Sequence, residues 1–94
     1  MARIVWTREA LANLELIRSY IHQFDPQAAR RMARRLIEAS DTLQVYPDRG
    51  RPAERGRREL VTIPPYIIRY LVDGDRVFIV GIRHSAQLPD DEEA

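Results

Sequence analysis

The chain has 94 residues, a formal net charge of +1 and no cysteine. This length predicts one domain with a small core, and the lack of cysteine excludes disulfides and thiolate metal sites. Its apolar runs are too short for a membrane span and its N-terminus has no signal-peptide pattern, so we expect a cytoplasmic protein. With His22 and His84 far apart in the sequence, we expect neither a metal site nor a cofactor.

The charge is unevenly distributed along the chain. Residues 26–58 hold nine Arg against four acidic residues, whereas residues 90–93 are all acidic. Every one of the fifteen basic residues is Arg, which suits bidentate contacts with phosphate or carboxylate. Codon bias in a GC-rich genome would produce the same excess of Arg. The arginines are therefore either solvated surface residues or contacts for an anionic partner.

The first half predicts a short strand followed by a helical hairpin. Residues 3–6 form the strand, and Thr7 caps a helix with an apolar stripe that ends near Phe24. Asp25 and Pro26 are the N-cap and first residue of a second helix that runs to about Val45. The short connection makes the two helices antiparallel. The apolar stripes are Ala10, Leu14, Ile17, Ile21 and Phe24 in the first helix, and Ala29, Met32, Leu36, Ala39 and Leu43 in the second.

Four arginines lie on the flanks of the second helix, at 30, 31, 34 and 35. Glu38 is spaced for an ion pair with Arg34. The loop from Pro47 to Gly56 is rich in turn residues and Arg, so it is either a surface connector or a segment that meets phosphate.

The second half predicts three strands between residues 57 and 87. β-branched and aromatic residues dominate it. Pro64-Pro65 separates the first strand from the second, and the Asp73–Asp75 turn joins the second to the third as a hairpin. We therefore expect an α+β fold with the order β-α-α-β-β-β, in which the helical hairpin packs on one face of a small, mainly antiparallel sheet. A single domain is expected over residues 1–89, with an acidic, frayed tail over 90–94.

Pairing the strands across that turn sorts their side chains into two faces. One face is free of charge before its end, so we place it against the helices, where Gly81 would permit a close approach. The opposite face has no predicted cover but stays apolar, which marks it as a candidate partner site. The helix-facing set is Tyr66, Ile68, Tyr70, Val72, Val77, Ile79, Gly81 and Arg83, and the opposite set is Ile67, Arg69, Leu71, Arg76, Phe78, Val80, Ile82 and His84.

A candidate catalytic set lies on the same strands. Arg58, Arg69, Arg83 and His84 could converge at one end of the sheet, where Arg would hold a phosphate and His would act as acid or base. RNA cleavage by 2′-hydroxyl attack needs such a set. The plainer alternatives are an ion pair of Arg58 with Glu59 and a solvated histidine.

These elements together resemble the RelE/ParE superfamily of bacterial toxins. The matching motifs span residues 3–89 and are specific in their order and spacing. They are Trp6-Thr7, Ala28-Ala29-Arg30, Leu43 with Pro47 and Gly50-Arg51, Arg58-Glu59-Leu60, Pro65–Tyr70 and Val80–His84. The resemblance implies the toxin of a type II toxin–antitoxin pair that assembles with a cognate antitoxin.

The superfamily contains two activities, and the resemblance favours one of them. RelE-like members are ribosome-dependent mRNA endonucleases, whereas ParE-like members inhibit DNA gyrase. RelE-like chains often carry Arg where this chain has Ile67, and a tyrosine after the last strand, where Leu88-Pro89 stands here. The chain is therefore closer to ParE, a non-enzymatic gyrase inhibitor of the plasmid-stabilisation type.

Two rival hypotheses remain beside the gyrase inhibitor. One is a RelE-like nuclease acting on mRNA at the ribosome through Arg58, Arg83 and His84. The other is an inactive module that only binds its partner. The residues expected to bind the target or the antitoxin are Arg58, Ile67, Arg69, Leu71, Phe78, Val80, Ile82, Arg83 and His84.

Overall fold

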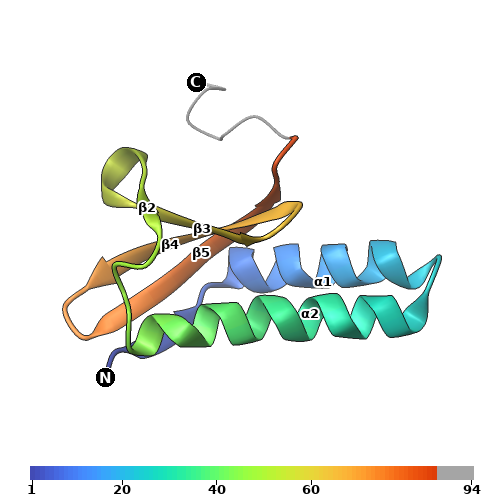
Figure 1. Ribbon diagram of the computed structural model, residues 1–94, viewed down its shortest axis with the longest axis horizontal. Coiled ribbons are helices and arrows are strands. Elements are labelled where there is room, and N and C mark those ends of the chain that lie inside the picture. The colour runs from blue at the N-terminus through green and yellow to red at the C-terminus, as the bar shows by residue number, and fades with distance from the viewer. Residues whose placement is uncertain (87–94) are drawn as a thin grey trace.

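The chain folds into two layers, with both helices on the same side of a five-stranded sheet (Figure 1). The computed structural model describes residues 1–86. The predicted α+β architecture is confirmed, and the predicted tail over 90–94 lies outside the described residues. In chain order the elements are β1 (Arg3–Trp6), α1 (Arg8–His22), α2 (Pro26–Asp41), the 3₁₀ turn η1 (Thr42–Gln44), β2 (Arg51–Pro52), the 3₁₀ turn η2 (Glu54–Gly56), β3 (Arg58–Ile63), β4 (Tyr66–Asp73) and β5 (Arg76–His84).

The strands lie in the order β1-β5-β4-β3-β2. β1 runs parallel to β5, and every other pair is antiparallel. The predicted breaks are confirmed, because Pro64-Pro65 joins β3 to β4 and Gly74-Asp75 forms the two-residue turn before β5. Gly74 has a φ of 61°, which explains why glycine suits this turn. The sequence alone left the place of the first strand open.

Both predicted helix caps are present. The Thr7 hydroxyl accepts a hydrogen bond from the backbone N–H of Ala10 at 3.2 Å. The Asp25 carboxylate accepts from the N–H groups of residues 27 and 28 at 3.0 and 3.1 Å. In the described part of the chain, Arg34 and Glu38 form no ion pair, although their spacing would allow one. Both side chains are exposed, where such pairs gain little.

The core lies between the helices and the inner face of the sheet. The sheet contributes Tyr70 at its centre, and the helices contribute small and branched residues around it. Phe24, predicted to end the apolar stripe of α1, is exposed instead. The main buried residues are Ala10, Leu36, Ala39, Leu43, Leu60, Ile68, Tyr70, Val77, Ile79 and Ile82.

A β-bulge shifts the last part of β5 away from the predicted alternation. Tyr70 pairs with Ile79 but Arg69 pairs with Gly81, so Val80 is an extra residue with no partner on β4. The bulge moves the following side chains to the opposite faces from those predicted. Ile82, expected on the outer face, is 5% exposed and belongs to the core.

Candidate partner-binding surface

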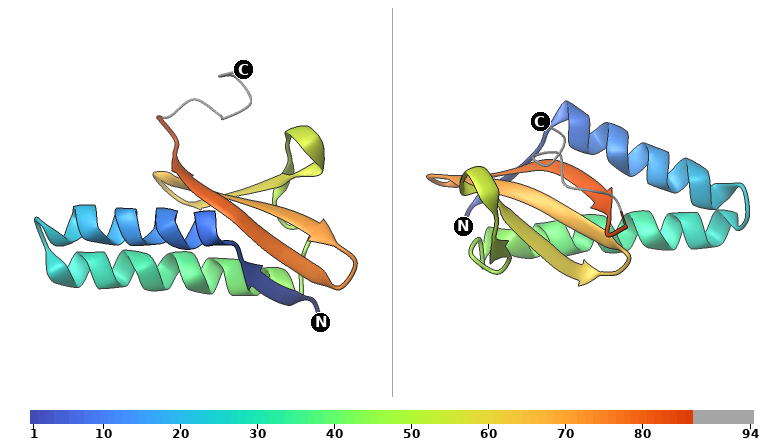
Figure 2. Two further views of the ribbon diagram at one scale, coloured as in Figure 1. Left: turned by 180° about the vertical axis from the view of Figure 1, so that it is seen from behind. Right: turned by 90° about the horizontal axis from the view of Figure 1, so that it is seen from above.

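The sheet face opposite the helices carries a half-buried apolar strip. Phe78 pairs with Leu71 on β4 and with Val5 on β1, and all three side chains are half-buried. Ile67, further along β4, is 7% exposed. The helices lie on the other side of the sheet (Figure 2). The strip corresponds to the apolar second face expected from the sequence, extended by Val5.

Beside this strip lies a pocket of about 290 Å³ lined with arginine. The carboxylate of Glu59, which is buried, accepts from Arg51 at 3.0 Å and from Arg83 at 3.5 Å. Arg69 of β4 lies opposite Glu59 of β3 in the sheet, and it also lines the pocket. The bulge explains why Arg83 lies here, since the prediction placed it on the helix-facing side. Guanidinium groups in this number suit an anionic group on a partner.

Arg58 does not take part in this pocket. Its Nη1 donates to the carbonyl oxygens of Gly50 at 2.7 Å and Asp48 at 3.2 Å. The Tyr70 hydroxyl donates to the carbonyl of Pro47 at 2.8 Å and accepts from the N–H of Gly50 at 2.7 Å. Arg58 therefore holds the loop before β2, and the ion-pair partners of Glu59 are Arg51 and Arg83 instead.

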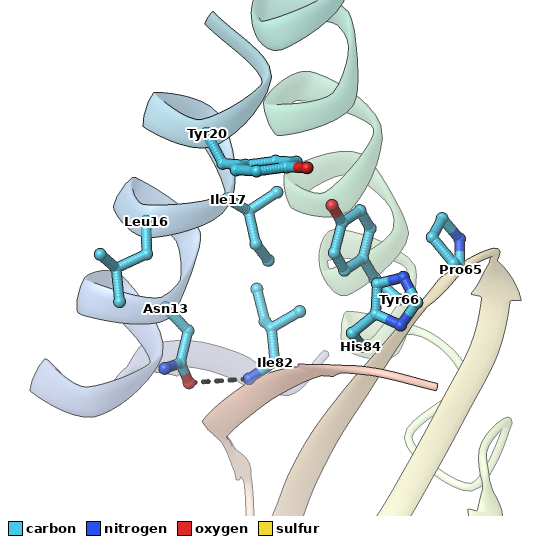
Figure 3. Close-up of a pocket in the computed structure, with 8 residues that line it drawn as sticks. All are labelled: Asn13, Leu16, Ile17, Tyr20, Pro65, Tyr66, Ile82 and His84. Carbon is cyan, nitrogen blue, oxygen red and sulfur yellow. Dashed lines mark hydrogen bonds between the residues drawn. The ribbon is translucent and has the colours of Figure 1, made fainter. Parts of the chain in front are cut away.

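His84 lies on the helix side of the sheet, contrary to its predicted face. It lies opposite Tyr66 on the neighbouring strand, and the two rings pack edge to face with their centroids 5.6 Å apart. Its Nδ1 accepts a hydrogen bond from the N–H of Ala86 at 3.0 Å. Burial raises the pKa of Tyr66, with a smaller contribution from Tyr20. Both rings line a groove of about 590 Å³ beside α1 (Figure 3).

The predicted convergence of Arg58, Arg69, Arg83 and His84 therefore occurs only in part. Arg69 and Arg83 share the arginine pocket, whereas Arg58 and His84 lie elsewhere. Arg51 was not among the predicted site residues, because β2 is too short to show a strand pattern. The sequence does contain an indication that Glu59 is special, since it is the one acidic residue in residues 58–63.

Two other kinds of site are absent from residues 1–86. These residues contain no group of three or more His, Asp or Glu placed to hold a metal ion. None of their helices has the length and apolar character that crossing a membrane requires.

Comparison with known proteins supports the resemblance drawn from the motifs. Residues 4–89 match the family described as the ParE toxin of the type II toxin–antitoxin system parDE. Toxin RelE2 of Caulobacter vibrioides is 58% identical over 88 residues, covering 94% of this chain and all of that protein. The putative toxin Y4kP of Sinorhizobium fredii is 44% identical over 87 residues, covering 90% of each.

A solved structure shares the fold as well. The chromosomal ParDE toxin–antitoxin system from P. aeruginosa aligns with a TM-score of 0.80 and 29% identity, covering 89% of this chain and 96% of that one. The small α+β domain is thus a member of the RelE/ParE superfamily. Within that superfamily, the chain belongs to the ParE family and is the toxin component of a type II toxin–antitoxin system.

Proposed function

We propose that this toxin inhibits DNA gyrase in the cytoplasm and that a cognate antitoxin neutralises it. The match to the parDE family over residues 4–89 and the similarity to a ParDE system support this assignment. The absence of Arg at Ile67 supports it too, because this departs from the RelE-like pattern. Such a toxin would serve plasmid stabilisation or an equivalent chromosomal role.

The separation of the candidate catalytic residues carries the proposal. Cleavage of RNA by its own 2′-hydroxyl needs a base, a charge stabiliser and a proton donor around one phosphate. Here Arg58 is bound to backbone carbonyls, Arg83 is bound to Glu59 and His84 lines the groove beside α1. This arrangement favours a binding protein over an enzyme that uses these three residues.

The outer face supplies the surface that such a binding protein needs. A disordered antitoxin segment would order over the apolar strip of Val5, Leu71 and Phe78. An acidic group on the antitoxin or on the target would meet Arg51, Arg69 and Arg83. Toxin and antitoxin would then form a hetero-oligomer.

A ribosome-dependent mRNA endonuclease is the second candidate. The name of the 58% identical relative, RelE2, favours it, and so does the arginine pocket, which suits phosphate as well as carboxylate. Such an enzyme would have to use groups other than the set Arg58, Arg83 and His84 acting together.

Induced expression in cells separates these functions and the inactive module. Gyrase inhibition predicts filamentation and DNA-damage signalling before protein synthesis falls. An early stop in translation with cleaved mRNA would contradict the proposal and support the nuclease. Normal growth together with retained antitoxin binding would leave only the partner-binding module.

A further inference from the structure

Helix α2 presents four arginines to solvent. The core side of this helix contains Ala29, Leu36 and Ala39, which are buried. Because each residue turns the helix by about 100°, the arginines fall on the side opposite to these three. All four are exposed, so they form a basic surface on the helical layer that faces away from the sheet. This surface, called the α2 strip below, consists of Arg30, Arg31, Arg34 and Arg35.

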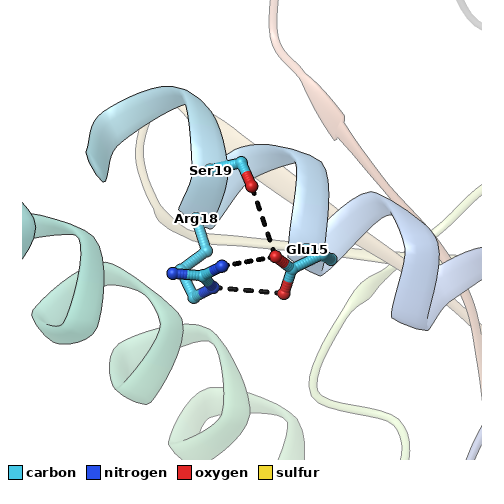
Figure 4. A network of polar contacts seen from close by, with 3 residues as sticks. All are labelled: Glu15, Arg18 and Ser19. Atoms are coloured by element: carbon cyan, nitrogen blue, oxygen red, sulfur yellow. Dashed lines mark hydrogen bonds and ion pairs between the residues drawn. The ribbon is translucent and has the colours of Figure 1, made fainter. Parts of the chain in front are cut away.

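The charge of the α2 strip has no partner in the described part of the chain. Within residues 1–86, none of the four arginines forms a hydrogen bond or an ion pair. Residues 26–37 contain no acidic residue. In α1, by contrast, Glu15 accepts hydrogen bonds from Arg18 and Ser19, so opposite charges offset each other (Figure 4). The bond from Arg18 also lowers the pKa of Glu15.

The arrangement of charge in α2 does not favour the helix itself. The α2 strip contains two pairs of arginines that lie four residues apart, and like charges at this spacing repel each other. The helix has no basic residue in its last turn, where the helix dipole favours a cation, and it ends with Asp41 instead. The arginines therefore contribute to binding an anion rather than to folding.

The basic surface continues into a pocket beside the C-terminal end of α2. This pocket has a volume of about 350 Å³, and two arginines and two threonines are among the residues that line it. They are Arg35, Arg49, Thr42 and Thr62. The Nη1 of Arg49 donates to the Thr42 hydroxyl at 2.7 Å, which holds this arginine at the pocket. Glu38 also lines the pocket and ends the run of positive charge along the helix. Guanidinium groups and hydroxyls are donors that suit phosphate oxygens.

Charge and spacing select a chain of phosphates as the occupant. Four residues of helix advance by about 6 Å, and each strand of a duplex carries a phosphate about every 3.4 Å along its axis, so long arginine side chains can reach separate phosphates. A membrane-binding helix inserts its apolar face, but that face of α2 is buried in the core. Residues 26–41 contain none of the aromatic anchors that are typical of protein interfaces.

We propose that the α2 strip binds the phosphate backbone of duplex nucleic acid without reading its sequence. The guanidinium groups of the strip hold phosphates along one strand, and Arg49 holds a further phosphate at the pocket. Such contacts fix the position of the helix on the duplex and carry no sequence information. This binding goes beyond the proposed inhibition of gyrase, and it is separate from the arginine pocket on the outer face of the sheet.

The test is a titration of a fluorescent DNA duplex of about 20 base pairs with the purified toxin, between about 50 and 200 mM salt. Five phosphate contacts predict that the logarithm of the binding constant falls with the logarithm of salt concentration with a slope of about −4.5. The double variant Arg30→Gln/Arg34→Gln should bind at least tenfold more weakly, and its slope should be shallower by about 1.8.

Arg3→Gln/Arg76→Gln is the matched control for net charge. These two exposed arginines lie opposite each other on β1 and β5, so the control removes the same charge from the sheet layer. Its affinity should stay within about threefold of wild type, since it removes no phosphate contact. Equal losses in the two double variants would show that net charge alone attracts DNA and would overturn the site. Unchanged binding by Arg30→Gln/Arg34→Gln would overturn it as well.

Two further arms identify the ligand. A duplex RNA of the same sequence shows which nucleic acid the strip prefers, and tighter binding of either one supports contact with the backbone. Vesicles of phosphatidylglycerol that bind as tightly as DNA, through the same arginines, would overturn nucleic acid as the partner. Thermal unfolding should show Arg30→Gln/Arg34→Gln at least as stable as wild type, because a repelling pair is removed. A loss of stability would show that these arginines serve the fold and would contradict the proposal.

Discussion

At the scale of single residues, Tyr70 and Gly50 fix the loop that precedes β2. A Cβ added to Gly50 would lie 2.7 Å from the Tyr70 hydroxyl and 2.8 Å from the carbonyl oxygen of Glu59. The close fit leaves room for glycine alone and directs its N–H toward the Tyr70 oxygen. This contact positions the segment that carries Arg51 and therefore one side of the arginine pocket.

Tyr70→Phe should lower the free energy of unfolding by about 1–3 kcal/mol. The substitution removes the partner of the Gly50 N–H and the Pro47 carbonyl without changing the volume of the ring. Urea unfolding of both proteins measures the difference. Tyr46→Phe is the control, since Tyr46 is 63% exposed and should change nothing. Equal shifts in the two variants would contradict this role of Tyr70.

The ionisation of the same tyrosine makes the stability of the protein depend on pH. Burial, the largest cause, raises the pKa of Tyr70 above its usual value of 10.0. A raised pKa in the folded state gives stability that is present below about pH 10 and is lost as the pH climbs above it. Unfolding measured at about pH 9 and about pH 11 should show this loss. The decline should be smaller in Tyr70→Phe, and an identical decline would contradict the assignment.

At the scale of elements, the hairpin of α1 and α2 depends on the cap between them. The Asp25 carboxylate holds two N–H groups at the start of α2, and Pro26 occupies the first helical position. These residues end one helix and begin the next within three residues. The direction of α2 across the sheet follows from that short connection.

Asp25→Ala should destabilise the protein by about 0.5–2 kcal/mol, because two helical N–H groups lose their acceptor. Thermal unfolding followed by far-ultraviolet circular dichroism measures it. Asp41→Ala removes an exposed acid at the other end of the same helix, where its side chain makes no capping hydrogen bond. If the two variants lose the same stability, the Asp25 cap does not hold the start of α2 in place.

The sequence predicts the elements well because their boundaries have local chemical causes. Thr7, Asp25 and Gly74 each stop or start an element through their own side chain or backbone, so no distant contact is needed. The bulge at Val80 has a different origin, since it arises where β5 passes between β4 and α1. Because of this extra residue, Ile82, Arg83 and His84 lie on the faces of the sheet opposite to those predicted. Of the arginine pocket, the sequence predicted Arg69 and Arg83 but missed Arg51, because Arg51 lies in a strand of only two residues.

At the scale of the whole molecule, the domain offers two different surfaces on opposite sides of the sheet. The outer face combines an apolar strip with arginine, whereas no Asp, Glu, Lys or Arg is among the described residues that line the groove beside α1. We expect target binding to depend on the charged surface, because the proposed inhibition of gyrase requires specific binding of a large partner. The proposed antitoxin would block the target by covering that surface.

Arg51→Ala should reduce growth inhibition on induction while leaving stability within about 0.5 kcal/mol of wild type. The Arg51 side chain is 58% exposed, and without it Glu59 keeps Arg83 as an ion-pair partner. Growth curves and urea unfolding give the two measurements. Arg31→Ala, on the exposed side of α2, is the control and should remain fully toxic. Full toxicity of Arg51→Ala would exclude this pocket from target binding.

The most direct test of the gyrase assignment runs two assays on one preparation of the purified toxin. The first follows supercoiling of relaxed plasmid by DNA gyrase, and the second follows mRNA in a translating extract. Gyrase inhibition predicts that supercoiling is blocked, that added antitoxin restores it, and that the mRNA stays intact. Cleaved mRNA together with normal supercoiling would contradict gyrase inhibition and identify a ribosome-dependent nuclease.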